Sequence, residues 1–116
     1  GLSPLAQRMI RAAREVTGAL GVFACVPRPD LVGEPPAGGA YCLAEPGRQY
    51  AVYFPQGGKA TLDVSAARGA PLSLRWYDID GGRWRPARQV TAVGPVPLQA
   101  PGGGQWAAVL VRKEGL

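Results

Sequence analysis

Apolar residues near the start of the chain recur every three or four positions, which predicts one amphipathic helix over residues 4–20. Ser3 can cap the first free amides of this helix, and Pro4 has a backbone angle that suits the first turn. The apolar stripe consists of Leu5, Met9, Ala13, Val16 and Leu20. The other faces carry Arg8, Arg11, Arg14 and Glu15, which we expect to form the solvated side of the helix.

The segment 27–39 separates this helix from the rest of the chain. It holds four prolines and three glycines in thirteen positions. Because proline lacks a backbone N–H group, we expect an extended linker in which no strand pairing survives. The predicted division is therefore an N-terminal helix with its Pro/Gly-rich linker at 1–39, followed by one β domain at 40–116.

Beyond residue 40 the apolar pattern changes from helical to alternating spacing, which indicates strands. The expected strands, separated by turns rich in glycine and proline, are 40–44, 49–54, 59–65, 72–79, 83–93 and 105–112. We expect 95–104 to be a broken segment with a short apolar patch. Strands at this spacing favour a mostly β fold, an antiparallel β-sandwich of about seven to eight strands.

The segment 72–79 shows the clearest alternation. Leu72, Leu74 and Trp76 fall on one face, so we expect Trp76 in the core, and the same alternation places Trp106 there. An Asp-Gly pair follows the strand and supplies the positive φ that a tight hairpin turn requires. The segment therefore predicts the first half of a hairpin, with the chain returning from residue 83.

The composition argues against most enzyme chemistry in this chain. Its 116 residues include no His, which removes Ser-His and Cys-His dyads and the commonest zinc ligand. Asp78 and Asp80 are the one close pair of carboxylates, and the glycines beside them make turn formation the expected role, ahead of catalysis or calcium binding. We expect no catalytic residue, no metal and no cofactor.

The chain is basic, with 13 Lys and Arg against 8 Asp and Glu and a formal net charge of +5. The basic residues are spread along the sequence, whereas a nucleic-acid site should concentrate them on one element among aromatic residues. No stretch approaches the roughly 20 apolar residues that a membrane span needs. Neither nucleic acid nor membrane is therefore an expected partner, and the charge is interpreted as a solvated surface.

The two cysteines, Cys25 and Cys42, lie in apolar settings. A buried free thiol is the usual occupant of such a position. A disulfide between them stays open as an alternative, because the sequence does not fix their separation in space.

One surface feature suggests ligand binding, the aromatic and basic residues at the 75–85 hairpin. Trp84 directly follows the turn, and an exposed tryptophan between guanidinium groups could stack on a sugar face or on a proline-rich chain. The alternative is that Trp84 packs on Tyr77 or on an arginine stem within the hairpin. The predicted ligand-binding residues are Arg75, Tyr77, Arg83, Trp84 and Arg85.

Residues 40–58 read AYCLAEPGRQYAVYFPQGG, which resembles a signature in the C-terminal β-sandwich of apiosidase-like glycoside hydrolases, a module catalogued as a collagen-binding domain. The resemblance continues through TLDVS at 61–65, LRWYD at 74–78 with Gly81, and QWAAVLV at 105–111. Residues 4–32 are similar to the last barrel helix and the linker that precede this module. Two features depart from the family pattern, Cys25 and the proline- and glycine-rich stretch at 33–39.

The resemblance implies a non-catalytic accessory module of a carbohydrate-active enzyme, secreted or periplasmic, although the chain shows no signal peptide. The family's catalytic carboxylates belong to a (β/α)8 barrel that this chain lacks, so no catalytic role is carried over. The expected partner is that barrel, and the apolar stripe of the helix would lie at the interface and be partly exposed in the isolated chain. Polysaccharide binding is a further expectation. The main alternative is an adhesion module for collagen or another fibrous protein, and a free-standing small enzyme is less favoured.

Overall fold

Residues 1–21 and 24–113 are described by the structure, a computed structural model. Its elements in chain order are α1 (Pro4–Ala19), β1 (Val26–Pro27), η2 (Pro29–Leu31), β2 (Val32–Gly33), β3 (Tyr41–Glu45), β4 (Gln49–Phe54), β5 (Lys59–Asp63), η3 (Ser65–Ala67), β6 (Pro71–Asp78), β7 (Arg83–Trp84), β8 (Arg88–Thr91), β9 (Pro95–Gln99) and β10 (Trp106–Arg112). The mostly β fold is confirmed, and seven of these strands have four or more residues.

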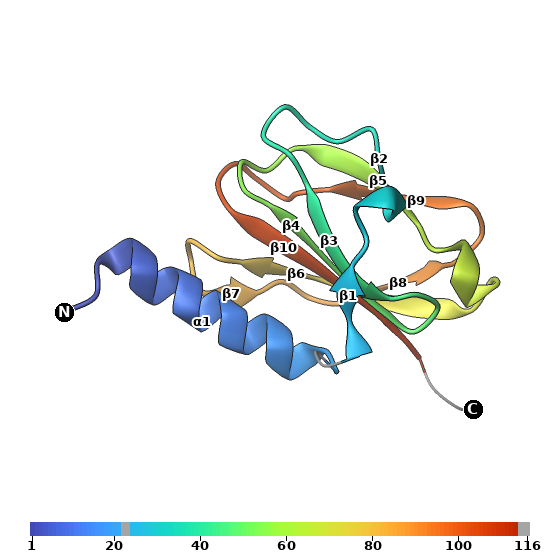
Figure 1. Cartoon of the computed structure of the whole chain (residues 1–116), viewed down its shortest axis with the longest axis horizontal. Helices are drawn as coiled ribbons and strands as arrows, with labels where there is room; N and C mark the ends of the chain where they lie inside the picture. Colours follow the sequence, from blue (N-terminus) through green and yellow to red (C-terminus); the bar gives the residue numbers. More distant parts are fainter. Residues whose placement is uncertain (22–23, 114–116) are drawn as a thin grey trace.

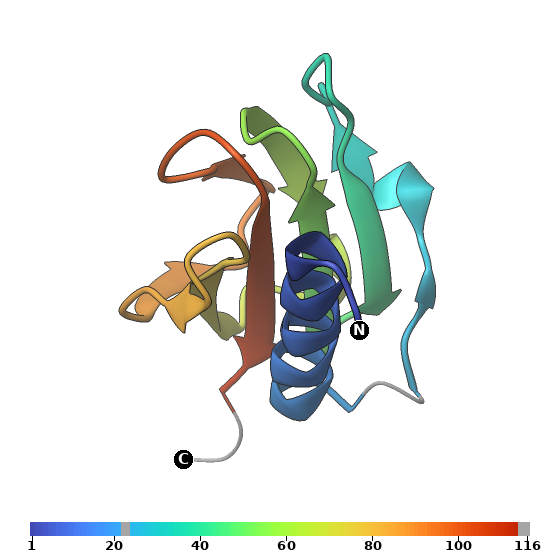
Figure 2. The same cartoon turned by 90° about the vertical axis from the view of Figure 1, so that its left-hand side faces the viewer.

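The strands form two antiparallel sheets packed face to face (Figure 1). The larger sheet has the order β1-β3-β4-β10-β6-β7, and β8 also pairs with β6. The smaller sheet has the order β2-β5-β9. Helix α1 lies on the outer face of the larger sheet, and Figure 2 shows it with β10 on one side and β3 on the other. The molecule therefore has three layers: small sheet, large sheet and a single helix.

The main core fills the space between the two sheets, where alternate residues of each strand meet. Trp76 and Trp106 both belong to it, as expected. The ring centroids of Trp76 and Phe54 are 5.5 Å apart, and Trp106 meets Trp76 edge-on at 6.5 Å. Such tilted and edge-on pairs add to the free energy of burial alone. This aromatic cluster therefore joins the three central strands β4, β6 and β10.

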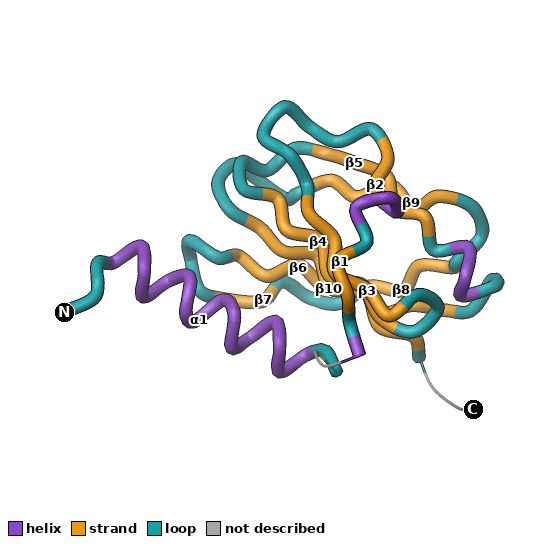
Figure 3. Tube along the Cα trace, viewed as in Figure 1, coloured by secondary structure: helices purple, strands orange, loops and turns teal. Residues whose placement is uncertain are grey.

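The expectation that 27–39 forms no strand pairs is wrong at two places. Strand β1 pairs with β3 through Val26↔Ala44 and Pro27↔Leu43, and β2 pairs with β5. Pro27 is tolerated because β1 is an edge strand, and the next amide, of Arg28, donates to the carbonyl of Cys42 at 2.9 Å. Loop structure is limited to Arg28, between β1 and η2, and to the end of the segment, between β2 and β3 (Figure 3). The division at 39/40 stays a prediction.

Two further strand predictions differ from the structure. The expected single strand 83–93 is two short strands, β7 and β8, which both pair with β6. Pro86 lies between them and cannot continue a ladder. The expected broken segment 95–104 begins with a regular strand, β9, whose Val96 and Leu98 are buried against β5. Its prolines, Pro95 and Pro97, are accommodated because β9 is at the edge of its sheet.

Helix α1 begins as predicted, because the Ser3 hydroxyl accepts a hydrogen bond from the amide of Ala6 at 3.1 Å. Its burial differs from the expected stripe. Ala12 and Leu20 are buried against the sheet, while Leu5 is 52% exposed, Met9 36% and Ile10 40%. These three apolar side chains are therefore exposed instead of being buried against the sandwich.

Candidate functional site

The contacts between α1 and the β6–β7 hairpin involve the polar side of the helix. The indole Nε1 of Trp84 donates to Glu15 Oε2 at 3.0 Å. Arg8 Nε lies 4.0 Å from Asp80 Oδ1. A β-carbon on Gly82 would overlap the guanidinium of Arg11, so this glycine lets the helix approach the turn. Positions 8, 11 and 15 thus meet the hairpin along one helical face, which the sequence pattern assigned to solvent.

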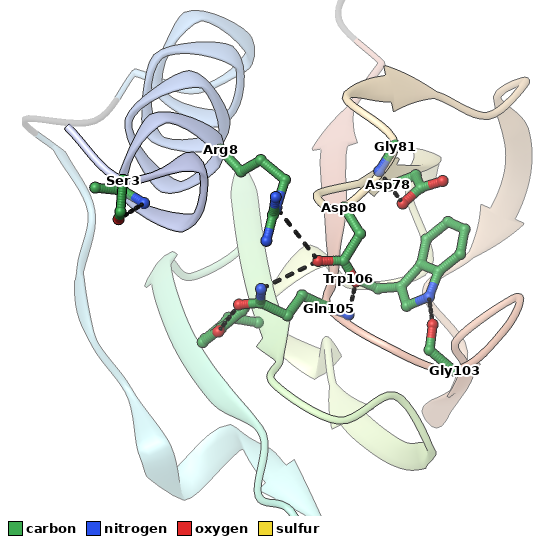
Figure 4. A network of polar contacts seen from close by, with 10 residues as sticks. Ser3, Arg8, Asp78, Asp80, Gly81, Gly103, Gln105 and Trp106 are labelled. Carbon is green, nitrogen blue, oxygen red and sulfur yellow. Dashed lines mark hydrogen bonds and ion pairs between the residues drawn. The ribbon is translucent and has the colours of Figure 1, made fainter. Parts of the chain in front are cut away.

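Asp80 is the centre of a network that joins α1, the hairpin and the start of β10 (Figure 4). Its carboxylate accepts hydrogen bonds from the backbone amide of Gln105 at 2.9 Å and from Gln105 Nε2 at 3.2 Å. The side-chain oxygen of Gln105 accepts from the hydroxyl of Tyr53 at 2.6 Å. Asp78 caps the turn by accepting from the amide of Gly81 at 2.8 Å. The two carboxylates therefore stabilise the hairpin turn and the loop before β10, in agreement with the turn-forming role expected from the sequence.

An apolar cleft of about 480 Å³ runs between α1 and the outer face of β3 and β4. The helix contributes Met9, Ala13 and Val16, and the sheet contributes Tyr41, Leu43 and Tyr53. Tyr41 is 61% exposed, and its ring centroid is 6.4 Å from that of Tyr53. Burial raises the pKa of Tyr53, so its hydroxyl stays a neutral donor to Gln105. The cleft offers almost no polar atom to a ligand.

The predicted ligand-binding residues are only partly brought together. Arg75 Cζ lies 4.2 Å from the centroid of the Trp84 ring, and the ring of Tyr77 lies 5.0 Å from it. Tyr77 is 1% exposed, and burial raises the pKa of its hydroxyl. Arg83 and Arg85 are exposed, and alternation along β7 directs Arg83 to the face away from Trp84. Stacking within the hairpin, the alternative weighed for Trp84, is what the structure shows.

A second, polar pocket of about 370 Å³ lies where α1 passes this stack. It is lined by Arg14, Glu15, Gly18, Ala19, Arg75 and Trp84. The sequence did not predict the contribution of Arg14 and Glu15, since Glu15 is four residues after Arg11 and suggests a pair within the helix. Its hydrogen-bond partner is instead Trp84, 69 positions away. No local pattern could have revealed that contact.

Cys25 and Cys42 are free thiols. The register of β1 on β3 places them three residues apart along the strand pair, which is about 10 Å and too far for a disulfide. Burial raises the pKa of the Cys42 thiol to about 11 from the ordinary 9.0, and burial also raises the pKa of Cys25. Neither thiol is therefore an activated nucleophile.

The raised pKa of Cys42 predicts a loss of stability in alkali. Between pH 9 and pH 11 the thiol ionises in the unfolded chain and stays protonated in the folded one, so the free energy of unfolding falls as pH rises through this window. We expect a steeper fall in the native chain than in Cys42→Ala, measured by urea unfolding at about pH 8 and at pH 11. An equal fall in the free energy of unfolding of both proteins would contradict the raised pKa of Cys42.

Within the described ranges, 1–21 and 24–113, there is no group of three or more His, Cys, Asp or Glu side chains that could hold a metal ion. No helix in this part of the chain is long and apolar enough to cross a membrane. The two pockets described above, one apolar and one polar, lie on the two sides of α1.

A protein-family model described as "Putative collagen-binding domain of a collagenase" matches residues 26–111. No curated protein matches the chain. Among solved structures, a glycoside hydrolase family 5 protein from Bacteroides vulgatus ATCC 8482 is similar, with a TM-score of 0.76, 17% identity, and coverage of 90% of this chain and 24% of that one. A structure described as a glycoside hydrolase gives a TM-score of 0.77 at 17% identity, covering 94% of this chain and 25% of that one. The chain thus spans about a quarter of these structures, and at this identity the likeness shows the fold.

Proposed function

Because the chain belongs to this collagen-binding-domain family, with residues 26–111 forming the matched domain, we propose that it is a non-catalytic accessory β-sandwich of a carbohydrate-active enzyme. The module packs on the catalytic domain through the exposed half of α1 and the outer face of β1 and β3. The parent protein is a glycoside hydrolase that is secreted or periplasmic, and the module helps it to hold polysaccharide.

The observation that carries this proposal is the exposure of large apolar side chains on α1 and on the neighbouring strands β1 and β3. Leu5, Met9 and Ile10 on the helix and Val26, Tyr41 and Leu43 on the strands are all exposed, and Met9, Tyr41 and Leu43 line the same apolar cleft. Monomeric soluble proteins rarely expose so many large apolar side chains together, and such patches mark interaction sites. The coverage of 24–25% of the glycoside hydrolase chains supports a large partner in the same polypeptide.

The position of α1 supports the same assignment. The family model begins at Val26 and leaves α1 outside the matched domain. The superposition on the second glycoside hydrolase covers 94% of this chain, so most of α1 lies within it. The helix thus lies outside the family domain but within the superposition on a larger enzyme. Both features are expected of the last helix of a preceding catalytic domain.

The test is a binding titration between this chain, which contributes α1, and a separately produced catalytic domain of its parent polypeptide that ends before α1. We expect a one-to-one complex that Met9→Glu weakens at least tenfold, because the charge would be buried in an apolar interface. Val93→Glu is the matched control, since Val93 is 73% exposed at a turn away from the cleft. Failure to form a complex, or equal affinity of both variants, would refute packing through this surface.

The second candidate function, adhesion to collagen or another fibrous protein, is favoured by the description of the family. The aromatic cleft with Tyr41 and Tyr53 suits an extended proline-rich strand, because such strands dock in grooves lined by aromatic rings. Immobilised triple-helical collagen, compared with gelatin, tests this function. Binding that prefers the triple helix and is lost in Tyr41→Ala would favour adhesion over the accessory role.

A further inference from the structure

The polar pocket between α1 and the β6–β7 hairpin holds more positive charge than its surroundings balance. Arg14 and Arg75 both line it, and neither forms an ion pair within the described part of the chain. The carboxylate of Glu15 also lines the pocket, and it already accepts the indole hydrogen bond of Trp84. Two arginines without an ion pair therefore line the same pocket.

Arg75 is held in place before any ligand arrives. Its guanidinium carbon lies 4.2 Å from the centroid of the Trp84 ring, where a cation–π interaction restrains it. Trp84 is restrained in turn by the buried ring of Tyr77 and by the hydrogen bond to Glu15. A stacked guanidinium keeps its N–H edge free and loses little rotamer freedom on binding. The half-buried Arg75 is therefore ordered before a ligand binds.

The polar pocket is separate from the apolar cleft. The apolar cleft is lined on the helix by Met9, Ala12, Ala13 and Val16, and the polar pocket by Arg14, Glu15, Gly18 and Ala19. No residue belongs to both, because the two sets lie on opposite flanks of α1. Gly18 has open space around its α-carbon, so the helix does not close the pocket. A partner that fills only the apolar cleft thus leaves the lining of the polar pocket uncovered.

We propose that this pocket binds the carboxylate of an acidic polysaccharide, a hexuronate unit, through Arg75 and Arg14. The inference rests on the proposed function, of which it names the ligand class. Arginine forms paired hydrogen bonds with a carboxylate, and these are stronger than bonds between neutral groups. The pocket volume of about 370 Å³ is within the range of small-molecule sites and admits a sugar unit beside the indole. Recognition is by charge, since Arg75 already occupies the space over the Trp84 ring.

The test is affinity electrophoresis of the whole chain in gels containing polygalacturonate, with fully methyl-esterified polygalacturonate as the matched polymer without charge. We expect retardation by the acidic polymer, loss of at least tenfold in affinity with Arg75→Gln, and a comparable loss with Arg14→Gln. Arg88→Gln is the control, because this substitution removes the same charge. Arg88 is exposed on the neighbouring strand β8 and does not line the pocket. Circular dichroism checks that each variant is folded. If Arg75→Gln does not fold, Arg14→Gln alone tests the contribution of the pocket arginines.

Three results would overturn the inference. Equal weakening by Arg75→Gln and Arg88→Gln would show diffuse attraction to a basic surface. Equal retardation by the esterified polymer would show recognition of a neutral sugar, and absence of retardation would exclude the ligand class. The packing role is tested separately by the titration with the catalytic domain, so it stands or falls independently of these gels.

Discussion

Replacing Trp76 by alanine is expected to lower the free energy of unfolding by about 3–5 kcal/mol, the usual cost of removing a large aromatic side chain from a core. Trp76 is 8% exposed on the inner face of β6, and it contacts both Phe54 and Trp106. Its loss would leave a cavity between the two sheets that the surrounding strands cannot close, because three of them share this cluster.

Urea unfolding followed by circular dichroism measures this effect, because the signal does not depend on the tryptophan removed. Trp84→Ala is the matched control: it deletes the same side chain from the outer face, where Trp84 is only partly buried. We expect a clearly smaller loss for Trp84→Ala. A loss below about 1.5 kcal/mol for Trp76→Ala would contradict the central role of the aromatic cluster.

The strands with two-residue alternation could be predicted from the sequence. In β6 the alternation of Leu72, Leu74 and Trp76 identified both the strand and its buried face, and the structure confirms both. The two-residue strands β1 and β2 were missed, since prolines and glycines obscure the pattern there. Their pairing depends on partners far along the chain, such as Leu62 for Val32, which a local pattern cannot show. The edge positions that tolerate Pro27 and Pro95 are likewise a property of the assembled sheets.

The helix could be predicted, but not which half of its apolar side packs on the sandwich. The expected stripe included Leu5, Met9 and Ala13, and all three are exposed, whereas Ala12 is buried. The apolar arc is wider than one sheet face can cover. The spacing of apolar residues identifies the whole apolar side of the helix. It does not show which of these residues pack on the sandwich and which stay available to another molecule. The resemblance to glycoside hydrolase modules implied partial exposure of the helix, which the structure shows, whereas the partner that would cover it stays a prediction.

The candidate polar site was predictable only in part. The sequence identified the hairpin residues Arg75 and Trp84, since an aromatic residue beside arginines is a local feature. It assigned Arg14 and Glu15 to a solvated helix face, which is the usual place for charged helical residues. Their approach to Trp84 follows from the docking of α1, which joins residues 69 positions apart. A site assembled from two distant segments requires the tertiary structure.

The last prediction concerns the turn that joins β4 to β5, where Gly57→Ala should destabilise the chain by about 2–5 kcal/mol. Gly57 is buried and has φ +67°, a conformation that costs a residue with a β-carbon about 1–2 kcal/mol. A β-carbon there would also lie 2.7 Å from the carbonyl oxygen of Gly102, so the two loops would have to separate. Overpacking of this kind adds roughly 1–3 kcal/mol.

Two control glycines separate the contributions. Gly94 has φ +80° with no atom near its missing β-carbon, so Gly94→Ala should show the conformational cost alone, about 1–2 kcal/mol. Gly103 has neither feature, and Gly103→Ala should be neutral within about 0.5 kcal/mol. Urea unfolding should thus show the largest loss in the free energy of unfolding for Gly57→Ala, a smaller one for Gly94→Ala and almost none for Gly103→Ala. Equal losses at Gly57 and Gly94 would show that the contact with Gly102 is unimportant. In the expected case, Gly57→Ala also displaces the loop that leads to Gln105, which loosens the Asp80 network and with it the contact between hairpin and α1.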